Sequence, residues 1–157
     1  MTLHYHPIDS AFVTAVRAGG PDAYGNPAEQ VTAGSGPNPC RNCLSLVPEG
    51  APMLILAARP FPALQPYAET GPVFLCGDDC AAHDPATDGV PEVLTAVADY
   101  LLKGYSPEHR IVYGSGKVVL REDLQDYAAT LLQDPRIAYV DVRSARNNCF
   151  LARITAS

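Results

Sequence analysis

The sequence lacks tryptophan, has only two methionines, and is poor in charge, with Asp, Glu, Lys and Arg making up 18% of its 157 residues. It also lacks a long hydrophobic run. The longest, residues 51–58, is far shorter than the roughly 20 residues of a membrane-spanning helix. Since 47% of the residues are hydrophobic, the chain can build a core and is not intrinsically disordered. We therefore expect a single folded domain over residues 1–157 that has no membrane partner.

Basic side chains are scarce as well, with 11 Lys plus Arg against 17 Asp plus Glu and a net charge of −6. This balance argues against a nucleic-acid partner and leaves a small molecule or another protein as the expected one. A signal peptide needs a basic and then an apolar stretch, whereas residues 1–10 contain two histidines, a proline and an aspartate. We expect a cytoplasmic protein, in which cysteines are more often free or metal-bound than paired as disulfides.

What the chain does have is many turn-forming residues, 12 Gly and 15 Pro, which predicts short elements and long Gly/Pro-rich loops. Residues 21–39 show no helical or strand period and are expected to form one long loop. Short apolar runs at 53–58 and 73–76 predict buried strands, and alternation at 137–142 and 149–154 predicts two more.

Two main helices are predicted. One begins at Pro91 and carries an apolar stripe that ends at Leu101, and the other has apolar residues at helical spacing from Leu124 to Leu132. A shorter helix is expected over residues 10–18. Together these elements indicate an α+β domain with one largely antiparallel sheet and two main helices.

The five cysteines are not evenly spread, and four of them form two closely spaced pairs. Two residues separate Cys40 from Cys43, and 32 residues separate Cys43 from Cys76, which is followed by Cys80 and His83. Ligands on tight turns can face one tetrahedral zinc ion. Two sets of four fit: Cys40, Cys43, Cys76 and Cys80, or Cys40, Cys43, Cys80 and His83. The spacing therefore predicts a structural zinc site.

The sequence also allows the thiols roles without a metal. Cys76 ends an apolar strand and Cys149 lies in strand-like sequence, so both could simply be buried. A redox dithiol of Cys40 and Cys43 would need a lowered thiolate pKa, which Arg41 could provide. The strand that precedes such a motif in thioredoxin-like folds is replaced here by a Gly/Pro loop.

The C-terminal segment, residues 136–157, has four arginines and a single aspartate in an otherwise acidic chain. Planar guanidinium groups suit carboxylates and phosphates, so Arg143 and Arg146, together with Arg41 or Arg59, are candidates for binding an anion. The alternative function is thus an enzyme for a small anionic metabolite, with Cys40 or a metal-bound water as nucleophile. The simpler interpretation is that these arginines balance nearby acidic groups.

Three motifs occur in a fixed order: Asn-Pro-Cys-Arg-Asn-Cys-Leu at 38–44, Tyr-Ala-Glu-Thr-Gly-Pro-Val-Phe at 67–74, and Asp-Pro-Arg-Ile-Ala-Tyr-Val at 134–140. With these motifs the chain resembles, nearly end to end, a bacterial family known as domain of unknown function 1203. The resemblance implies a single-domain bacterial protein of about this length with no assigned activity. Our leading hypothesis is a small binding or accessory module stabilised by zinc.

Overall fold

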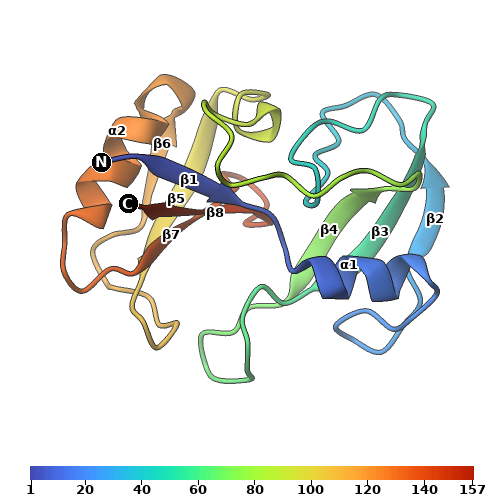
Figure 1. Ribbon diagram of the computed structural model, residues 1–157, viewed down its shortest axis with the longest axis horizontal. Helices are drawn as coiled ribbons and strands as arrows, with labels where there is room; N and C mark the ends of the chain where they lie inside the picture. The colour runs from blue at the N-terminus through green and yellow to red at the C-terminus, as the bar shows by residue number, and fades with distance from the viewer.

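A computed structural model describes residues 1–157 and contains two antiparallel sheets that lie side by side (Figure 1). The five-stranded sheet has the order β1-β8-β7-β5-β6 and the three-stranded sheet the order β2-β3-β4. The strands are β1 (Leu3–His6), β2 (Glu29–Thr32), β3 (Pro52–Ala58), β4 (Gly71–Cys76), β5 (Asp99–Tyr105), β6 (Lys117–Leu120), β7 (Tyr139–Ser144) and β8 (Phe150–Ala156). The chain ends meet because β1 pairs with β8.

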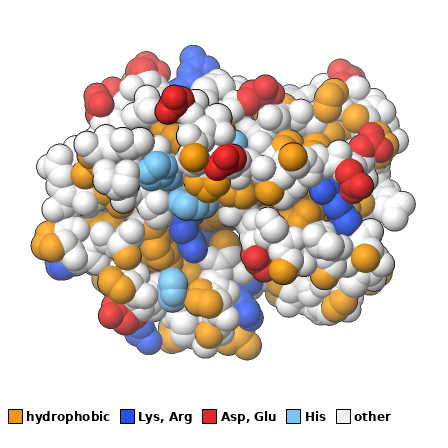
Figure 2. Space-filling model, viewed as in Figure 1, with side chains coloured by type: hydrophobic (Ala, Val, Ile, Leu, Met, Phe, Trp, Pro, Cys, Tyr) orange, Lys and Arg blue, Asp and Glu red, His pale blue; other side chains and the backbone are white.

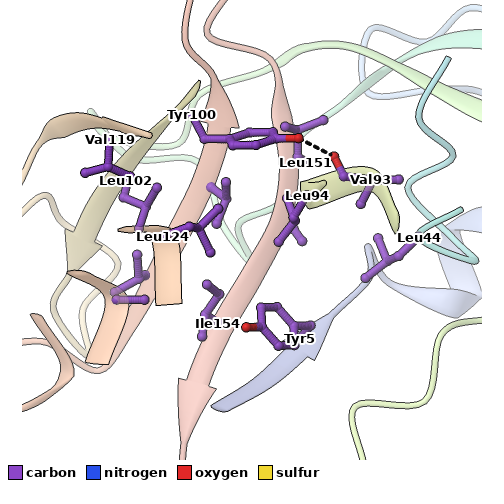
Figure 3. Packing of buried hydrophobic residues seen from close by; sticks show 14 of the residues in the cluster. Tyr5, Leu44, Val93, Leu94, Tyr100, Leu102, Val119, Leu124, Leu151 and Ile154 are labelled. Carbon is purple, nitrogen blue, oxygen red and sulfur yellow. Dashed lines mark hydrogen bonds between the residues drawn. The ribbon is translucent and has the colours of Figure 1, made fainter. Parts of the chain in front are cut away.

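The five-stranded sheet has one face covered by helix α2 (Leu124–Leu132), which follows the short 3-10 turn η2 (Arg121–Asp123). Leu124 and Ala128 turn the apolar stripe of α2 toward the sheet and are fully buried. Figure 3 shows this core, where Tyr100 donates a hydrogen bond from its hydroxyl to the carbonyl of Val93 at 3.1 Å. Burying apolar side chains and satisfying the tyrosine hydroxyl together stabilise this half.

The three-stranded sheet packs against helix α1 (Ser10–Arg17). The carboxylate of Asp9 caps α1 by accepting a hydrogen bond from the amide of Phe12 at 3.3 Å. Val13 and Val16 face a second core, which β3 and β4 complete with their inward-facing residues. β3 is the central strand and carries the most apolar sequence of the three.

The predicted fold class is confirmed, since the protein is a single compact α+β domain with two α-helices and antiparallel sheets. Several expected elements differ. The structure has two sheets where one was predicted. Residues 21–39 do not form a loop throughout, because they contain β2, which pairs with β3. β2 lies at the sheet edge and is largely exposed, so its sequence shows no apolar alternation.

The predicted helix from Pro91 to Leu101 is wrong. Only the 3-10 turn η1 (Glu92–Leu94) forms there, and β5 starts at Asp99. The second α-helix is instead α1, the shorter one expected over residues 10–18. In β5 the buried side chains alternate, and the strand hydrogen-bonds to β6 on one side and β7 on the other. Two neighbouring strands outweigh a weak helical stripe.

Neither α-helix could cross a membrane, since α1 has 8 residues and α2 has 9, and no helix combines the necessary length and apolar character.

Candidate metal centre

Four cysteine sulfurs from two distant segments of the chain meet in one cluster. The Sγ atoms of Cys40, Cys43, Cys76 and Cys80 all lie within 4.8 Å of one another. Cys40 Sγ is 3.8 Å from Cys80 Sγ, and Cys43 Sγ is 3.9 Å from Cys76 Sγ. We call these four residues the cysteine cluster. Each close pair combines one residue of the first segment with one of the second, so the two segments meet at the cluster.

The geometry suits a single tetrahedral ion. With metal–sulfur bonds of about 2.3 Å, the corners of a tetrahedron of sulfurs are about 3.8 Å apart. The two close sulfur–sulfur separations match this edge, and all five cysteines are free thiols rather than disulfides. The cluster could therefore hold a metal ion without a large rearrangement of the four side chains.

The first arm is residues 38–47, which we call the cysteine loop, and it is held by backbone hydrogen bonds to itself. The amide of Leu44 donates to the carbonyl of Cys40 at 3.1 Å, and the amide of Cys40 donates to the carbonyl of Ser45 at 2.9 Å. Leu44 adopts a left-handed φ of 56°, which is uncommon for a leucine. The resulting tight turn places both cysteine side chains on the same side.

The cysteine loop also joins the two halves of the molecule. Leu44 packs beside Val93, Leu94 and Tyr5 in the core of the five-stranded sheet (Figure 3), whereas Cys40 belongs to the core of the three-stranded sheet. Further hydrogen bonds run from the loop in several directions: to the segment before α1, to β4, and to the segments around residues 83 and 93.

The second arm begins where β4 ends. The amide of Gly77 donates to the carbonyl of Pro52 at 2.8 Å, and a Cβ at Gly77 would lie 2.7 Å from the backbone of Pro52. Only glycine allows this close approach, which brings Cys76 beside the cysteine loop and lets the chain turn so that Cys80 closes the cluster.

Three N–H groups point at the sulfurs. The amide of Cys76 donates to Cys40 Sγ at 3.3 Å, and Cys80 Sγ accepts from Asn42 Nδ2 at 3.4 Å and from Arg17 Nη2 at 3.1 Å. Arg17 also donates to the backbone carbonyl of Cys76 at 3.1 Å. Donors around sulfur ligands stabilise thiolates and fix their orientation, as expected around a metal site.

The thiols influence one another's protonation. Hydrogen bonding between Cys40 and Cys43 lowers the pKa of Cys40 and raises the pKa of Cys43. Burial raises the pKa of Cys76 to about 12. Without a cation, negative charge therefore concentrates on Cys40, because further thiolates would repel it in a buried site. A bound divalent cation removes that restriction.

Arginine supplies positive charge near the cluster without a carboxylate partner. Arg41 is buried, and burial lowers its pKa to about 10, while the charges of Cys149 and Cys40 act in the opposite direction. Together with Arg17, it balances a cluster that carries net negative charge when four thiolates bind one divalent ion.

His83 does not join the cluster, so of the two predicted sets the structure brings together the four cysteines. The amide of His83 donates to the carbonyl of Asn42 at 2.8 Å, and its buried Nε2 has no hydrogen-bond partner. Cys149 is also separate, with its Sγ 3.7 Å from the carbonyl of Asn147.

Of the candidate anion-binding arginines, Arg41, Arg143 and Arg146 are not in one site. Arg41 donates from Nε to the carbonyl of Phe150 at 2.7 Å, and Arg143 Nη1 pairs with Glu69 at 2.9 Å. Arg146 is exposed and pairs with Asp99 at 3.0 Å. The pocket that Arg143 lines contains neither Arg146 nor a member of the cysteine cluster. The geometry thus gives no support to a clamp of these arginines beside Cys40.

Arg17 is the functional residue that sequence reasoning missed. It lies on α1, 63 residues before the Cys80 sulfur that it contacts, and nothing in the local sequence of α1 marks it. Only the packing of α1 against the second arm brings the guanidinium to the cluster.

Fold and cluster define the protein as a small α+β domain with a four-cysteine site able to hold a metal ion. Residues 37–156 match the family described as a protein of unknown function, DUF1203, and the chain belongs to this family. The matched region includes all four cluster cysteines. Comparisons with curated proteins and with solved structures found no match.

Proposed function

We propose that this protein is a binding or accessory module whose fold is stabilised by a structural zinc ion held by Cys40, Cys43, Cys76 and Cys80. The observation that carries the proposal is the meeting of these four sulfurs within 4.8 Å of one another, with two separations, of 3.8 and 3.9 Å, close to the edge of a tetrahedron. Two arms that are distant in the sequence and rich in irregular structure come together at this point.

Zinc is the ion that the ligands favour. Four thiolates in a tetrahedron are typical of zinc or of iron, and a site this compact suits a single ion rather than an iron–sulfur cluster with several irons. Zinc has no redox chemistry and no strong geometric preference, so it accepts the arrangement that the two arms impose.

A structural role follows from the number of ligands. A catalytic zinc keeps one position open for water or substrate, whereas four cysteines close the coordination sphere. Cys40 is completely buried, which further limits access to the ion. Binding energy at such a site adds directly to the free energy of folding.

The test is the metal content and stability of Cys43→Ser, with Cys149→Ser as the matched control, since Cys149 is the one cysteine outside the cluster. Untagged protein purified without chelator is analysed by plasma mass spectrometry. The wild type and the control should contain about one zinc per chain, as expected for a single four-ligand site.

Cys43→Ser should lose the metal, and its free energy of unfolding should fall by about 3 kcal/mol or more. Unchanged metal content and melting in Cys43→Ser would contradict the proposal. Iron in place of zinc would keep the structural role and overturn the identity of the ion.

A further inference from the structure

A pocket of about 810 Å³ lies between the two halves of the molecule, away from the cysteine cluster. Its walls come from the end of β1, the start of α1, residues 21–23 after α1, the end of β3 with the segment that follows it, and β8. We call it the inter-sheet pocket. In Figure 2 a hollow between the two halves has Lys/Arg, histidine and hydrophobic side chains at its edges. The volume is in the usual range for small-molecule sites.

Two arginines of the inter-sheet pocket are anchored on neighbouring carbonyls. Arg153 Nη2 donates to the carbonyl of Pro60 at 2.8 Å, and Arg59 Nε donates to the carbonyl of Phe61 at 3.3 Å. Because these carbonyls belong to consecutive residues, the two guanidinium groups are held close to the same short piece of chain. Both arginines line the pocket.

Each guanidinium keeps N–H groups free for a ligand. Arg59 uses only Nε within the protein and has no carboxylate partner, so both of its Nη groups are unused. Arg153 directs Nε and Nη2 to the buried carboxylate of Asp141, at 2.7 and 3.0 Å, which leaves Nη1. The Arg153 guanidinium also stacks 3.8 Å from the ring centre of Tyr139, which fixes its plane.

The acidic residues of the pocket keep their charge, and backbone amides donate hydrogen bonds to them. Asp22 accepts from the amides of Tyr24, Asn26 and Ala57 at 2.9 to 3.0 Å, and Asp9 accepts from the first turn of α1. Such hydrogen bonds hold a carboxylate in place and occupy its oxygens, while its negative charge remains. The N–H groups of Arg59 and Arg153 that have no partner are therefore the donors that the pocket offers to a ligand anion.

Aromatic rings provide the apolar part of the pocket. Phe12 lines it from α1, Phe61 from the segment after β3, and Phe150 from β8. Phe61 and Phe150 also lie beside the Arg153 guanidinium, at 5.4 and 6.0 Å from their ring centres. An apolar surface next to a pair of unused donors is the usual composition of a site for an amphipathic small molecule.

We propose that the inter-sheet pocket binds a small organic acid, whose carboxylate is held by Arg59 and Arg153 and whose aromatic or aliphatic body contacts Phe12, Phe61 and Phe150. Guanidinium groups favour carboxylates through paired, charge-assisted hydrogen bonds. This site gives the proposed binding module its ligand class. It rests on the proposed function only because β3 and α1, which form part of the pocket, belong to the half that the zinc site stabilises.

Four probes test the proposal: benzoate, phenylacetate, hexanoate and, as the neutral analogue, phenylacetamide. Binding is followed by amide chemical shifts in NMR spectra, with Arg59→Gln as the variant. The control is Arg146→Gln, which removes the same charge from an exposed arginine outside the pocket. Arg153 is kept because its loss would leave Asp141 buried without a partner.

At least one of the three acids should shift the amide signals of Phe61, Thr155 and their neighbours. Arg59→Gln should weaken the binding of that acid about tenfold. Phenylacetamide should bind the wild type about as weakly as phenylacetate binds the Arg59→Gln variant. The proposal is overturned if no acid shifts these amides at millimolar concentration, or if Arg59→Gln and Arg146→Gln bind equally well. Metal content measured on the same samples separates this outcome from failure of the zinc site.

Discussion

The two halves of the molecule are stabilised in different ways. The five-stranded half has long antiparallel pairings and one helix packed on a continuous apolar core. The three-stranded half has a shorter sheet with an exposed edge strand, and long irregular segments at 33–51 and 77–91 surround it. The cysteine cluster lies in this second half.

The difference indicates where a bound metal ion would stabilise the fold most. Ordering an irregular segment costs about 1 to 2 kcal/mol per residue in backbone entropy, and loops bury little apolar surface to offset it. In the three-stranded half, three thiols from the two irregular segments and one from the end of β4 converge on one point. In the five-stranded half, the apolar core and the strand ladders suffice.

Removal of the metal should have the largest effect of the changes considered, and we expect this effect to be greatest in the three-stranded half. After treatment with a chelator, we expect amide hydrogen exchange in the cysteine loop, β3 and β4 to accelerate, with a loss of local stability on the order of 5 kcal/mol. β7 and β8 should keep most of their protection, since their core does not contain the cluster. Equal acceleration in both halves would contradict the comparison.

Leu124→Ala probes the other half. Leu124 is fully buried in the core of the five-stranded sheet, so the cavity should cost about 3 kcal/mol in the free energy of unfolding, measured by chemical denaturation. The control, Leu120→Ala, changes a side chain that is 52% exposed and should stay within about 0.5 kcal/mol of the wild type. Metal content should not change in either variant. Loss of metal from Leu124→Ala would mean that the halves are not independent.

Arg17→Gln should have the smallest effect on folding and a specific effect on the metal. The variant removes a donor to Cys80 Sγ and a positive charge beside the cluster. We expect metal affinity to fall about 10- to 100-fold in competition with a chromogenic chelator. Arg136→Gln is the control, because Arg136 is exposed and pairs with Asp134 far from any cysteine of the cluster in the sequence. If the two variants bind the metal with equal affinity, Arg17 does not contribute to the metal site.

Much of the fold could be predicted from local pattern. The apolar runs now seen in β3 and β4 and the stripe of α2 are strong signals, because β3 is buried on both faces while β4 and α2 each bury one face. The segment from Pro91 to Leu101 gave a wrong prediction because a few apolar residues fit both periods, and only the pairing of β5 with β6 and β7 decided between them.

For the candidate site, the sequence by itself determined the two pairs of cysteines. Two cysteines that are three or four positions apart on a tight turn can face the same metal ion, and this depends only on the local chain. Only the tertiary structure decided where the arms meet, that Cys76 rather than His83 completes the cluster, and that Arg17 lies against it. It also placed Arg59 and Arg153 in one pocket, 94 positions apart in the chain. The physical reason is that the partners of a charge or a thiol are set by long-range packing, which leaves no periodic trace in the sequence.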